Sequence, residues 1–419
     1  MITKTDRLLK EFINLHPKYI DLSLNRLKKL LEKVGNPHKK LPPTIHIAGT
    51  NGKGSTLSFI KNILINNNYS VHAYTSPHLE KFSERICINN QQINANRLLY
   101  ILQYIKKINK NNPITFFEIT TAAAFLLFSK YKADYLLLET GLGGRLDATN
   151  IIPKKFISII TSIGIDHEEY LGKTLKKITN EKLGIIKNTE NVIIAKQKKE
   201  IYNYIFSKLK KQKNVYYFNN NYKYKEINSK KFYFKFENIE LTLKKPQLHG
   251  LHQLENASTA IASTIILKKN NYKINFNSLG KSINETLWPG RLEILNYKNK
   301  IIILDGSHNL DGAEKLTKFL IENKLKPNVI FGMLNNKKIF EFLSILKKTI
   351  DILYPIEIPN EINAISNKEI SQIAIKLNIK SLLKNNFTNI HHSTMQHKNK
   401  YILITGSLYL VGKIRKKYL

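Results

Sequence analysis

The hydrophobic pattern of this chain consists of short apolar runs that alternate with longer stretches of helical periodicity. In the first part, the apolar runs predict strands at 44–48, 71–75, 135–139, 156–162 and 192–195, and a helix is predicted over 57–65. A second series begins near Trp288, with strands predicted at 301–304, 328–331, 352–355 and 401–405 and a helix at 311–322. Strands that alternate with helices form parallel sheets, so the sequence predicts the α/β class.

The segment 215–245 breaks this alternation. It contains runs such as KFYFKFENIELTL, in which aromatic and polar residues alternate with a period of two. This pattern predicts a small antiparallel β region on the edge of the first domain. A basic, aromatic surface of this kind can stack nucleic acid bases, but the same alternation is typical of any half-buried hairpin.

Length and pattern together predict two domains, because 419 residues exceed what one hydrophobic core organises. We place the boundary near residues 284–290. The first domain, 1–286, is predicted to hold a P-loop-type, mostly parallel sheet. The second, 287–419, is predicted to be a smaller Rossmann-like α/β domain.

The number of cysteines and the length of the apolar runs indicate the cellular compartment of this protein. Cys87 is the only cysteine, which excludes an intramolecular disulfide and a Cys-ligated zinc site and fits a reducing environment. No run of about 18 apolar residues is present, and the N-terminal stretch is amphipathic and unlike a signal peptide. We therefore expect a cytoplasmic protein with no membrane partner.

The charge of the chain is strongly positive, with 67 Lys and Arg against 31 Asp and Glu. A net charge of +36 ordinarily suggests nucleic acid or an anionic membrane. Of the 67 cations, however, 60 are lysines dispersed along a chain that is also rich in Ile and Asn, which indicates compositional drift. Against this background a retained arginine is informative, because only guanidinium makes planar bidentate contacts. Arg85, Arg145 and Arg291 all lie inside the motifs described next.

The segment IHIAGTNGKGST, residues 45–56, combines a strand, a glycine-rich loop and a helix start. Backbone N–H groups of such a loop bind phosphate, Lys53 adds a point charge, and Ser55 or Thr56 can offer a hydroxyl to Mg²⁺. Gly54 separates the lysine from the hydroxyl, which departs from the common spacing. The residues predicted to line this phosphate site are Thr50, Asn51, Gly52, Lys53, Gly54, Ser55 and Thr56.

Acidic and histidine side chains follow neighbouring predicted strands. Glu139 ends the run YLLLE and leads into the turn GLGGRLDATN, and His167 follows the run ITSIGID. Both residue types can ligate a metal at the edge where parallel strands end. Structural alternatives stay open: Glu139 as a solvated strand end, and His167 as a histidine satisfied within the fold. Asp147 in the turn could likewise form an Asx turn with the residues that follow. Lys182, on a helix that begins near residue 175, is by composition one lysine among 60.

The sequence TFFE, residues 115–118, precedes an apolar helix. Thr at the N-cap with Glu three residues later is a capping box. We therefore assign Glu118 to capping and predict ring stacking only for Phe117.

These motifs occur in a fixed order: AGTNGKGST, YTSPHL, SERI, TFFE, ETGLGGRLDATN, IGIDH, EKLGI, HQLENA, WPGRLE, DGSHN and TGSLYLVG. In this order the chain resembles the folylpolyglutamate synthase and dihydrofolate synthase family of the Mur ligase superfamily, over nearly its whole length. The resemblance implies an ATP-dependent ligase that phosphorylates a carboxylate of a pterin substrate and lets the amine of L-glutamate attack the acyl phosphate. We expect both activities, on dihydropteroate and on reduced folates, in a monomer without a nucleic acid partner.

The resemblance also assigns roles to residues. For metal binding it implies two Mg²⁺ ions, held by Ser55, Glu139, His167 and, if carbamylated by CO₂, Lys182. For catalysis it implies Lys53, His167, Lys182 and His308. For the nucleotide it adds Asn256 at adenine, Arg291 at the phosphates and Asp305 at the ribose. For the pterin it implies Ser76, Pro77, His78, Phe82, Arg85, Phe117 and Asp147. For glutamate it implies Ser407 and Lys337, although a strand-end serine is equally typical of a turn.

Two departures from the family pattern concern glutamate. A block that commonly reads DKD is NNKK here, which keeps Lys337 and replaces both acids, and Leu310 follows DGSHN where proline is frequent. Three alternatives stay open: folylpolyglutamate synthase activity alone, a Mur-type ligase acting on a cell-wall precursor, and a nucleic-acid-binding P-loop protein.

Overall fold

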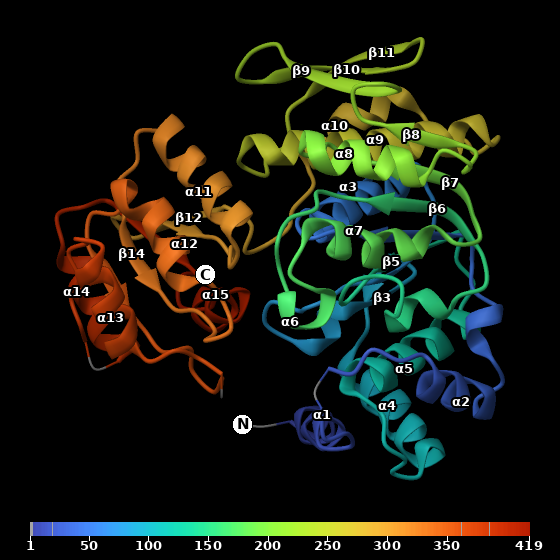
Figure 1. Ribbon diagram of the computed structural model, residues 1–419, viewed down its shortest axis with the longest axis horizontal. Helices are drawn as coiled ribbons and strands as arrows, with labels where there is room; N and C mark the ends of the chain where they lie inside the picture. Colours follow the sequence, from blue (N-terminus) through green and yellow to red (C-terminus); the bar gives the residue numbers. More distant parts are fainter. Residues whose placement is uncertain (1–2, 19, 362, 385) are drawn as a thin grey trace. The chain divides into compact units, whose positions relative to one another are not determined.

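An eight-stranded, mostly parallel sheet organises the first of two units in a computed structural model that describes residues 3–18, 20–361, 363–384 and 386–419 (Figure 1). This unit comprises Met1–Pro246 and Glu255–Thr286. The strand order is β4-β3-β2-β5-β1-β6-β7-β8, and only β3 and β4 run antiparallel to their neighbours. The strands are β1 (Thr44–Ala48), β2 (Val71–Tyr74), β3 (Ile86–Ile88), β4 (Gln91–Gln92), β5 (Tyr135–Glu139), β6 (Lys155–Ile160), β7 (Thr189–Ile194) and β8 (Val215–Tyr217).

Helices cover the sheet through apolar side chains. On β2 and β5, Tyr74, Leu136 and Leu138 belong to one core with the buried face of α5. Ala48, Ile160 and Val192 belong to another core with α7 and α8. The α-helices of this part are α1 (Lys4–Ile13), α2 (Asn25–Lys33), α3 (Lys53–Ile65), α4 (Ala95–Asn109), α5 (Phe116–Lys130), α6 (Glu168–Leu171), α7 (Leu175–Leu183), α8 (Lys199–Lys208), α9 (Leu251–Lys269) and α10 (Leu279–Asn284).

The aromatic segment forms a separate three-stranded antiparallel sheet of order β11-β10-β9, in which Phe232, Phe234 and Phe236 are buried. Its strands are β9 (Tyr222–Glu226), β10 (Lys231–Phe236) and β11 (Ile239–Lys244). The prediction was wrong for the first strand of this segment: β8 pairs parallel with β7 and extends the large sheet. Helix α8 connects β7 to β8, and a helical crossover returns the chain in the parallel direction.

The second unit comprises Gln247–Leu254 and Leu287–Leu419. Its five-stranded sheet has the order β12-β13-β16-β14-β15, with only β12 antiparallel. The strands are β12 (Glu293–Tyr297), β13 (Lys300–Leu304), β14 (Asn328–Phe331), β15 (Leu353–Pro355) and β16 (Tyr401–Thr405). The helices are α11 (Leu310–Glu322), α12 (Ile339–Leu346), α13 (Asn367–Lys376), α14 (Phe387–Gln396) and α15 (Leu408–Arg415). The α/β class is thus confirmed in both units.

Two further observations bear on sequence predictions. Cys87 lies buried on β3, where it pairs with Ala73 of β2 and Gln92 of β4. Within the described ranges, no helix combines the length and apolar character needed to cross a membrane.

Candidate active site

The glycine-rich loop joins β1 to α3, and backbone hydrogen bonds fix it to the segment after β6. The amides of Thr50 and Asn51 donate to the carbonyl of Ser162 at 2.9 and 3.2 Å, and the Thr50 hydroxyl accepts from the Gly164 amide at 3.0 Å. Gly52 has φ +87°, a left-handed conformation that favours glycine, and α3 begins at the next residue. The first amides of α3 therefore form a helix N-terminus at the end of the loop, where an anion is stabilised.

Two lysines converge on this loop. Lys53 donates to the carbonyls of Gly49 and Thr50 at 3.2 and 3.3 Å, and Lys182 on α7 donates to the same Gly49 carbonyl at 2.8 Å. Burial, together with the positive charge of Lys53, lowers the pKa of Lys182 to about 7. The Lys182 amine is therefore partly neutral at neutral pH, unlike a surface lysine.

The oxygen donors predicted for Mg²⁺ lie on two elements. Ser55 is buried in the first turn of α3, and Glu139 is buried at the end of β5, where Oε2 accepts from the Ser76 amide at 3.1 Å. His167 has φ +52° and precedes α6. In the described part of the chain, no group of three His, Cys, Asp or Glu side chains forms a metal cage. A hydroxyl and a carboxylate fit Mg²⁺ all the same, because this ion takes one or two carboxylates and completes its shell with water and phosphate oxygens.

The loop after β2 carries the residues predicted for the pterin. The Ser76–Pro77 peptide bond is cis. Arg85 is buried and donates from Nε to Nδ1 of His78 at 2.9 Å, and its guanidinium lies over the ring of Phe82 at 5.2 Å. The loop after β2 therefore places the Arg85 cation beside the aromatic ring of Phe82.

Phe117 reaches this region from the start of α5. Its ring stacks on Tyr74 with centroids 5.9 Å apart. A β-carbon at Gly141 would lie 2.5 Å from the same ring, so the glycine turn after β5 packs directly on Phe117.

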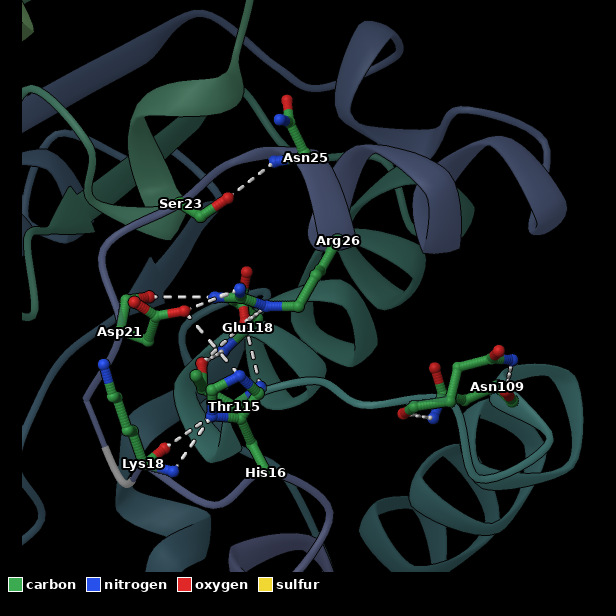
Figure 2. A network of polar contacts seen from close by, with 10 residues as sticks. His16, Lys18, Asp21, Ser23, Asn25, Arg26, Asn109, Thr115 and Glu118 are labelled. Atoms are coloured by element: carbon green, nitrogen blue, oxygen red, sulfur yellow. Dashed lines mark hydrogen bonds and ion pairs between the residues drawn. The ribbon is translucent and has the colours of Figure 1, made fainter.

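Glu118 caps α5, as predicted. Its Oε2 accepts from the amide and the hydroxyl of Thr115, both at 2.8 Å, and the Thr115 hydroxyl accepts from the Glu118 amide at 3.3 Å. Figure 2 shows a further partner that the sequence prediction missed: Arg26 donates from Nε to Glu118 Oε2 at 3.1 Å and also contacts Asp21. The other carboxylate oxygen, Oε1, is buried without a hydrogen-bond partner. Capping therefore uses only half of this carboxylate.

Asp147 forms the Asx turn that was one of its two interpretations. Its carboxylate accepts from the amide of Leu142 at 2.8 Å, from the amide of Thr149 at 2.9 Å and from the hydroxyl of Thr149 at 2.5 Å. Burial raises its pKa, which the hydrogen bonds oppose. A contact of Asp147 with pterin remains a prediction.

The glycine turn also docks on the helix that carries Lys182. The Arg145 amide donates to the Glu181 carbonyl at 2.7 Å, and a β-carbon at Gly144 would stand 2.7 Å from that same carbonyl oxygen. The Arg145 side chain is 56% exposed and pairs with the Glu181 carboxylate at 2.9 Å. Close packing against this backbone therefore explains Gly144.

Asn256 on α9 lies beside the phosphate loop. A β-carbon at Gly52 would approach its Oδ1 to 2.4 Å. This contact places a carboxamide next to the loop, where the base of a nucleotide could be recognised.

In the second unit, Arg291, Asp305 and His308 surround Gly306. Asp305 accepts from the amides of Leu292 and Ser307 at 3.0 and 3.1 Å, and burial raises its pKa. His308 Nδ1 lies 3.0 Å from the Gly306 carbonyl oxygen, and a β-carbon at Gly306 would lie 3.2 Å from Nη1 of Arg291.

The two residues predicted for glutamate lie on different loops of the second unit. Ser407 is the N-cap of α15 and accepts from the Tyr409 amide at 3.2 Å, so its turn interpretation holds. Lys337 lies in the turn between β14 and α12, and its amide donates to the Leu334 carbonyl at 3.2 Å.

Comparison with protein families divides the chain in two. Residues 47–264 match the Mur ligase middle domain, and residues 291–417 match the dihydrofolate synthetase C-terminal domain. The chain is 32% identical over 423 residues to the dihydrofolate synthase/folylpolyglutamate synthase of Bacillus subtilis, with 94% of each chain covered.

Solved structures agree with this assignment. The structure of Escherichia coli FolC in complex with DHPP and ADP has a TM-score of 0.88 and 27% identity and covers 99% of this chain and 97% of its own. The bifunctional Yersinia pestis enzyme complexed with AMPPNP and Mn ion has a TM-score of 0.86 and 26% identity and covers 100% and 98%. The chain therefore belongs to the dihydrofolate synthase/folylpolyglutamate synthase family and is an ATP-dependent amino-acid ligase.

Proposed function

We propose that this chain joins L-glutamate to dihydropteroate and also to the glutamate tail of reduced folates. The observation that carries the proposal is the position of Glu139. It ends β5, the neighbour of the strand that leads into the phosphate loop, and it accepts from the Ser76 amide of the loop predicted to bind pterin. One buried carboxylate thus connects the candidate nucleotide and pterin sites.

The reaction consists of two substitutions. A carboxylate oxygen of the pterin substrate attacks the γ-phosphorus of ATP, and the bond from that phosphorus to the ADP oxygen breaks. The neutral amine of L-glutamate then attacks the acyl carbon, the bond from that carbon to the phosphate oxygen breaks, and an amide forms as the nitrogen loses one proton and inorganic phosphate leaves. A carboxylate needs this activation because its own oxygen is a poor leaving group.

Residues of the first unit provide the charges that this chemistry requires. Lys53 and the N-terminus of α3 stabilise the negative charge that develops on the phosphates. Asn256 recognises adenine from its place beside Gly52. Mg²⁺, held by Ser55, Glu139 and His167, supplies positive charge against the phosphate oxygens when bound.

Aromatic surface and charge suit the pterin. Phe82 and Phe117 offer ring faces, and Arg85 supplies a buried cation that a carboxylate or a carbonyl of the substrate can accept from. The unpartnered Oε1 of Glu118 suits an N–H donor of the pterin ring. In the second unit, we assign Arg291, Asp305 and His308 to the nucleotide and Lys337 and Ser407 to glutamate.

Carbamylation of Lys182 is part of this proposal. The side-chain amines of Lys53 and Lys182 share the Gly49 carbonyl in the unmodified chain, and they repel each other whenever Lys182 is protonated. Conversion of the Lys182 amine to a carbamate replaces their repulsion by an attraction to Lys53 and creates an additional oxygen ligand for a second Mg²⁺. Its pKa of about 7 supports the reaction, because CO₂ adds only to the neutral amine.

The test is ADP release by the full-length chain with ATP, Mg²⁺ and L-glutamate, with dihydropteroate or tetrahydrofolate as the acceptor and Lys53→Ala as the inactive control. ADP release with both acceptors, each with a product one glutamate heavier by mass spectrometry, supports the proposal. Activity only with tetrahydrofolate restricts the chain to polyglutamate synthesis, and activity only with a UDP-linked peptide makes it a cell-wall ligase. We expect a cytoplasmic monomer, which sedimentation velocity and fractionation of cells would test.

A further inference from the structure

A buried chain of hydrogen bonds runs from the strand before the phosphate loop to the Asp147 turn. His46 lies in the middle of β1, and its Nε2 is 2.8 Å from the hydroxyl oxygen of Thr149. The same hydroxyl lies 2.5 Å from Oδ1 of Asp147. His46 and Thr149 are fully buried and Asp147 is nearly so, so no solvent competes with these contacts.

The number of hydrogens available fixes which group donates in each of these hydrogen bonds. The Thr149 hydroxyl has one hydrogen, and the Asp147 carboxylate accepts it along with two backbone amide hydrogens. The hydroxyl must then accept from His46, so Nε2 carries the ring hydrogen. Nδ1 of His46 is buried without a partner, which suits a lone pair and leaves no donor unsatisfied.

The other protonation states fit worse. A protonated Asp147 that donated to Thr149 would turn the hydroxyl toward Nε2 and place the ring hydrogen on Nδ1. An imidazolium would also carry a hydrogen there. Either state buries an unpaired N–H donor, which costs more free energy than a buried lone pair. Burial and the charge of Lys155 also hold the pKa of His46 well below its usual value.

We infer that His46 is a positioning residue for the pterin: through Thr149 it fixes the Asp147 carboxylate and the glycine turn that supports Phe117. The inference rests on the proposed function, in which Asp147 and Phe117 contact the pterin. Asp147 also accepts from the Leu142 amide, and neighbouring Gly141 packs on the Phe117 ring. Loss of the His46 N–H donor is therefore expected to loosen the glycine turn that contains Asp147.

Three variants separate positioning from general stability. His46→Leu keeps a buried apolar volume and removes the donor, whereas His46→Gln retains an N–H at similar reach. His72→Leu is the matched control, because His72 is equally buried on β2 of the same sheet and bonds instead to the Tyr131 carbonyl and the Asn89 amide. The Michaelis constants for dihydropteroate and ATP are measured for each variant and for the wild type.

His46→Leu is expected to raise the Michaelis constant for dihydropteroate about tenfold, with that for ATP and kcat within about threefold of the wild type. His46→Gln should recover most of this loss, and His72→Leu should leave the dihydropteroate value unchanged. Equal effects of the two leucine variants would overturn the inference. A wild type that does not use dihydropteroate would refute the proposed function itself, and with it the role given to His46.

A measurement on the wild type is independent of whether the leucine variant folds. ¹⁵N-labelled histidine distinguishes the two neutral tautomers and the imidazolium by their chemical shifts, and the signal lost in His46→Gln identifies His46 among the 12 histidines. A hydrogen on Nε2 alone is expected at neutral pH. A hydrogen on Nδ1 would reverse the hydrogen-bond chain and refute the inference.

Discussion

Alanine at position 52 is expected to weaken ATP binding by displacing a neighbouring side chain. A β-carbon on Gly52 would stand 2.4 Å from Oδ1 of Asn256, whereas ordinary contact begins at 3.4 Å. The amide must therefore move by about 1 Å, a displacement large enough to spoil a catalytic or binding geometry. Because the contact is with the end of a flexible side chain, the fold can accommodate the movement.

The expected magnitude has two parts. A left-handed backbone costs alanine roughly 1–2 kcal/mol, which lowers the free energy of unfolding. Displacing the amide removes the base contacts proposed for Asn256, worth about 1.4 kcal/mol, which corresponds to about a tenfold rise in the Michaelis constant for ATP.

Gly35 provides the matched control for the first part. It has φ +84°, and a β-carbon there would meet no atom within 4 Å. Gly35→Ala should therefore lose similar stability to chemical denaturation and keep the wild-type Michaelis constant for ATP.

A double-mutant cycle tests the second part. Asn256→Ala alone is expected to raise the Michaelis constant about tenfold, and the double variant Gly52→Ala/Asn256→Ala should be no worse, because both changes remove the same contact. Steady-state kinetics with varied ATP measure all three variants. A double variant about a hundredfold worse than wild type would show independent effects and refute the role given to Asn256.

Three further outcomes are expected. As the pH falls below about 7, the neutral fraction of Lys182 falls about tenfold per pH unit, so removal of CO₂ should reduce ADP release more at pH 6 than at pH 8; equal loss at both would contradict carbamylation. Glu139→Gln should raise the Mg²⁺ concentration needed for half-maximal activity, and an unchanged requirement would remove it from the metal site. Arg26→Lys should lower the free energy of unfolding by about 1–3 kcal/mol, because lysine cannot contact Glu118 and Asp21 together, whereas Arg145→Lys at an exposed pair should cost less than about 0.5 kcal/mol; equal losses in urea denaturation would refute this reasoning.

Buried parallel strands were the most predictable part of the fold. β1, β5, β14 and β16 coincide with the predicted bounds, because strands covered on both faces are rich in apolar residues. The helix predicted over 57–65 begins earlier, at Lys53. The prediction missed its first turn because those residues adjoin the glycine-rich loop and carry no apolar periodicity. The partner of β8 was not predictable, because alternation with period two indicates a half-exposed strand and not the strand beside it.

For the candidate site, the glycine-rich motif predicted a loop between a strand and a helix, and the structure has that loop between β1 and α3, with Lys53 bonded back to its carbonyls. Phosphate binding by this loop stays a prediction. Two arginine contacts were not predicted, although arginine is scarce in this chain. Arg26 contacts Glu118, and Arg415 makes a bidentate contact with Glu293 at 2.6–3.1 Å. Both lie outside any recognised motif, and only folding brings their partners from 92 and 122 residues away.

Cys87 is the single cysteine and is buried, so its reaction with a thiol reagent can report local opening of the unmodified chain. Cys87 lies on β3, and the loop that connects β2 to β3 contains His78, Phe82 and Arg85. A thiol reagent added to the native protein reacts with this buried thiol only after a local opening exposes it, so the labelling rate reports the free energy of that opening. No engineered probe and no second thiol complicates the signal. A molecule that binds to the loop between β2 and β3 and stabilises it is expected to slow this reaction, so labelling of Cys87 measures binding without turnover.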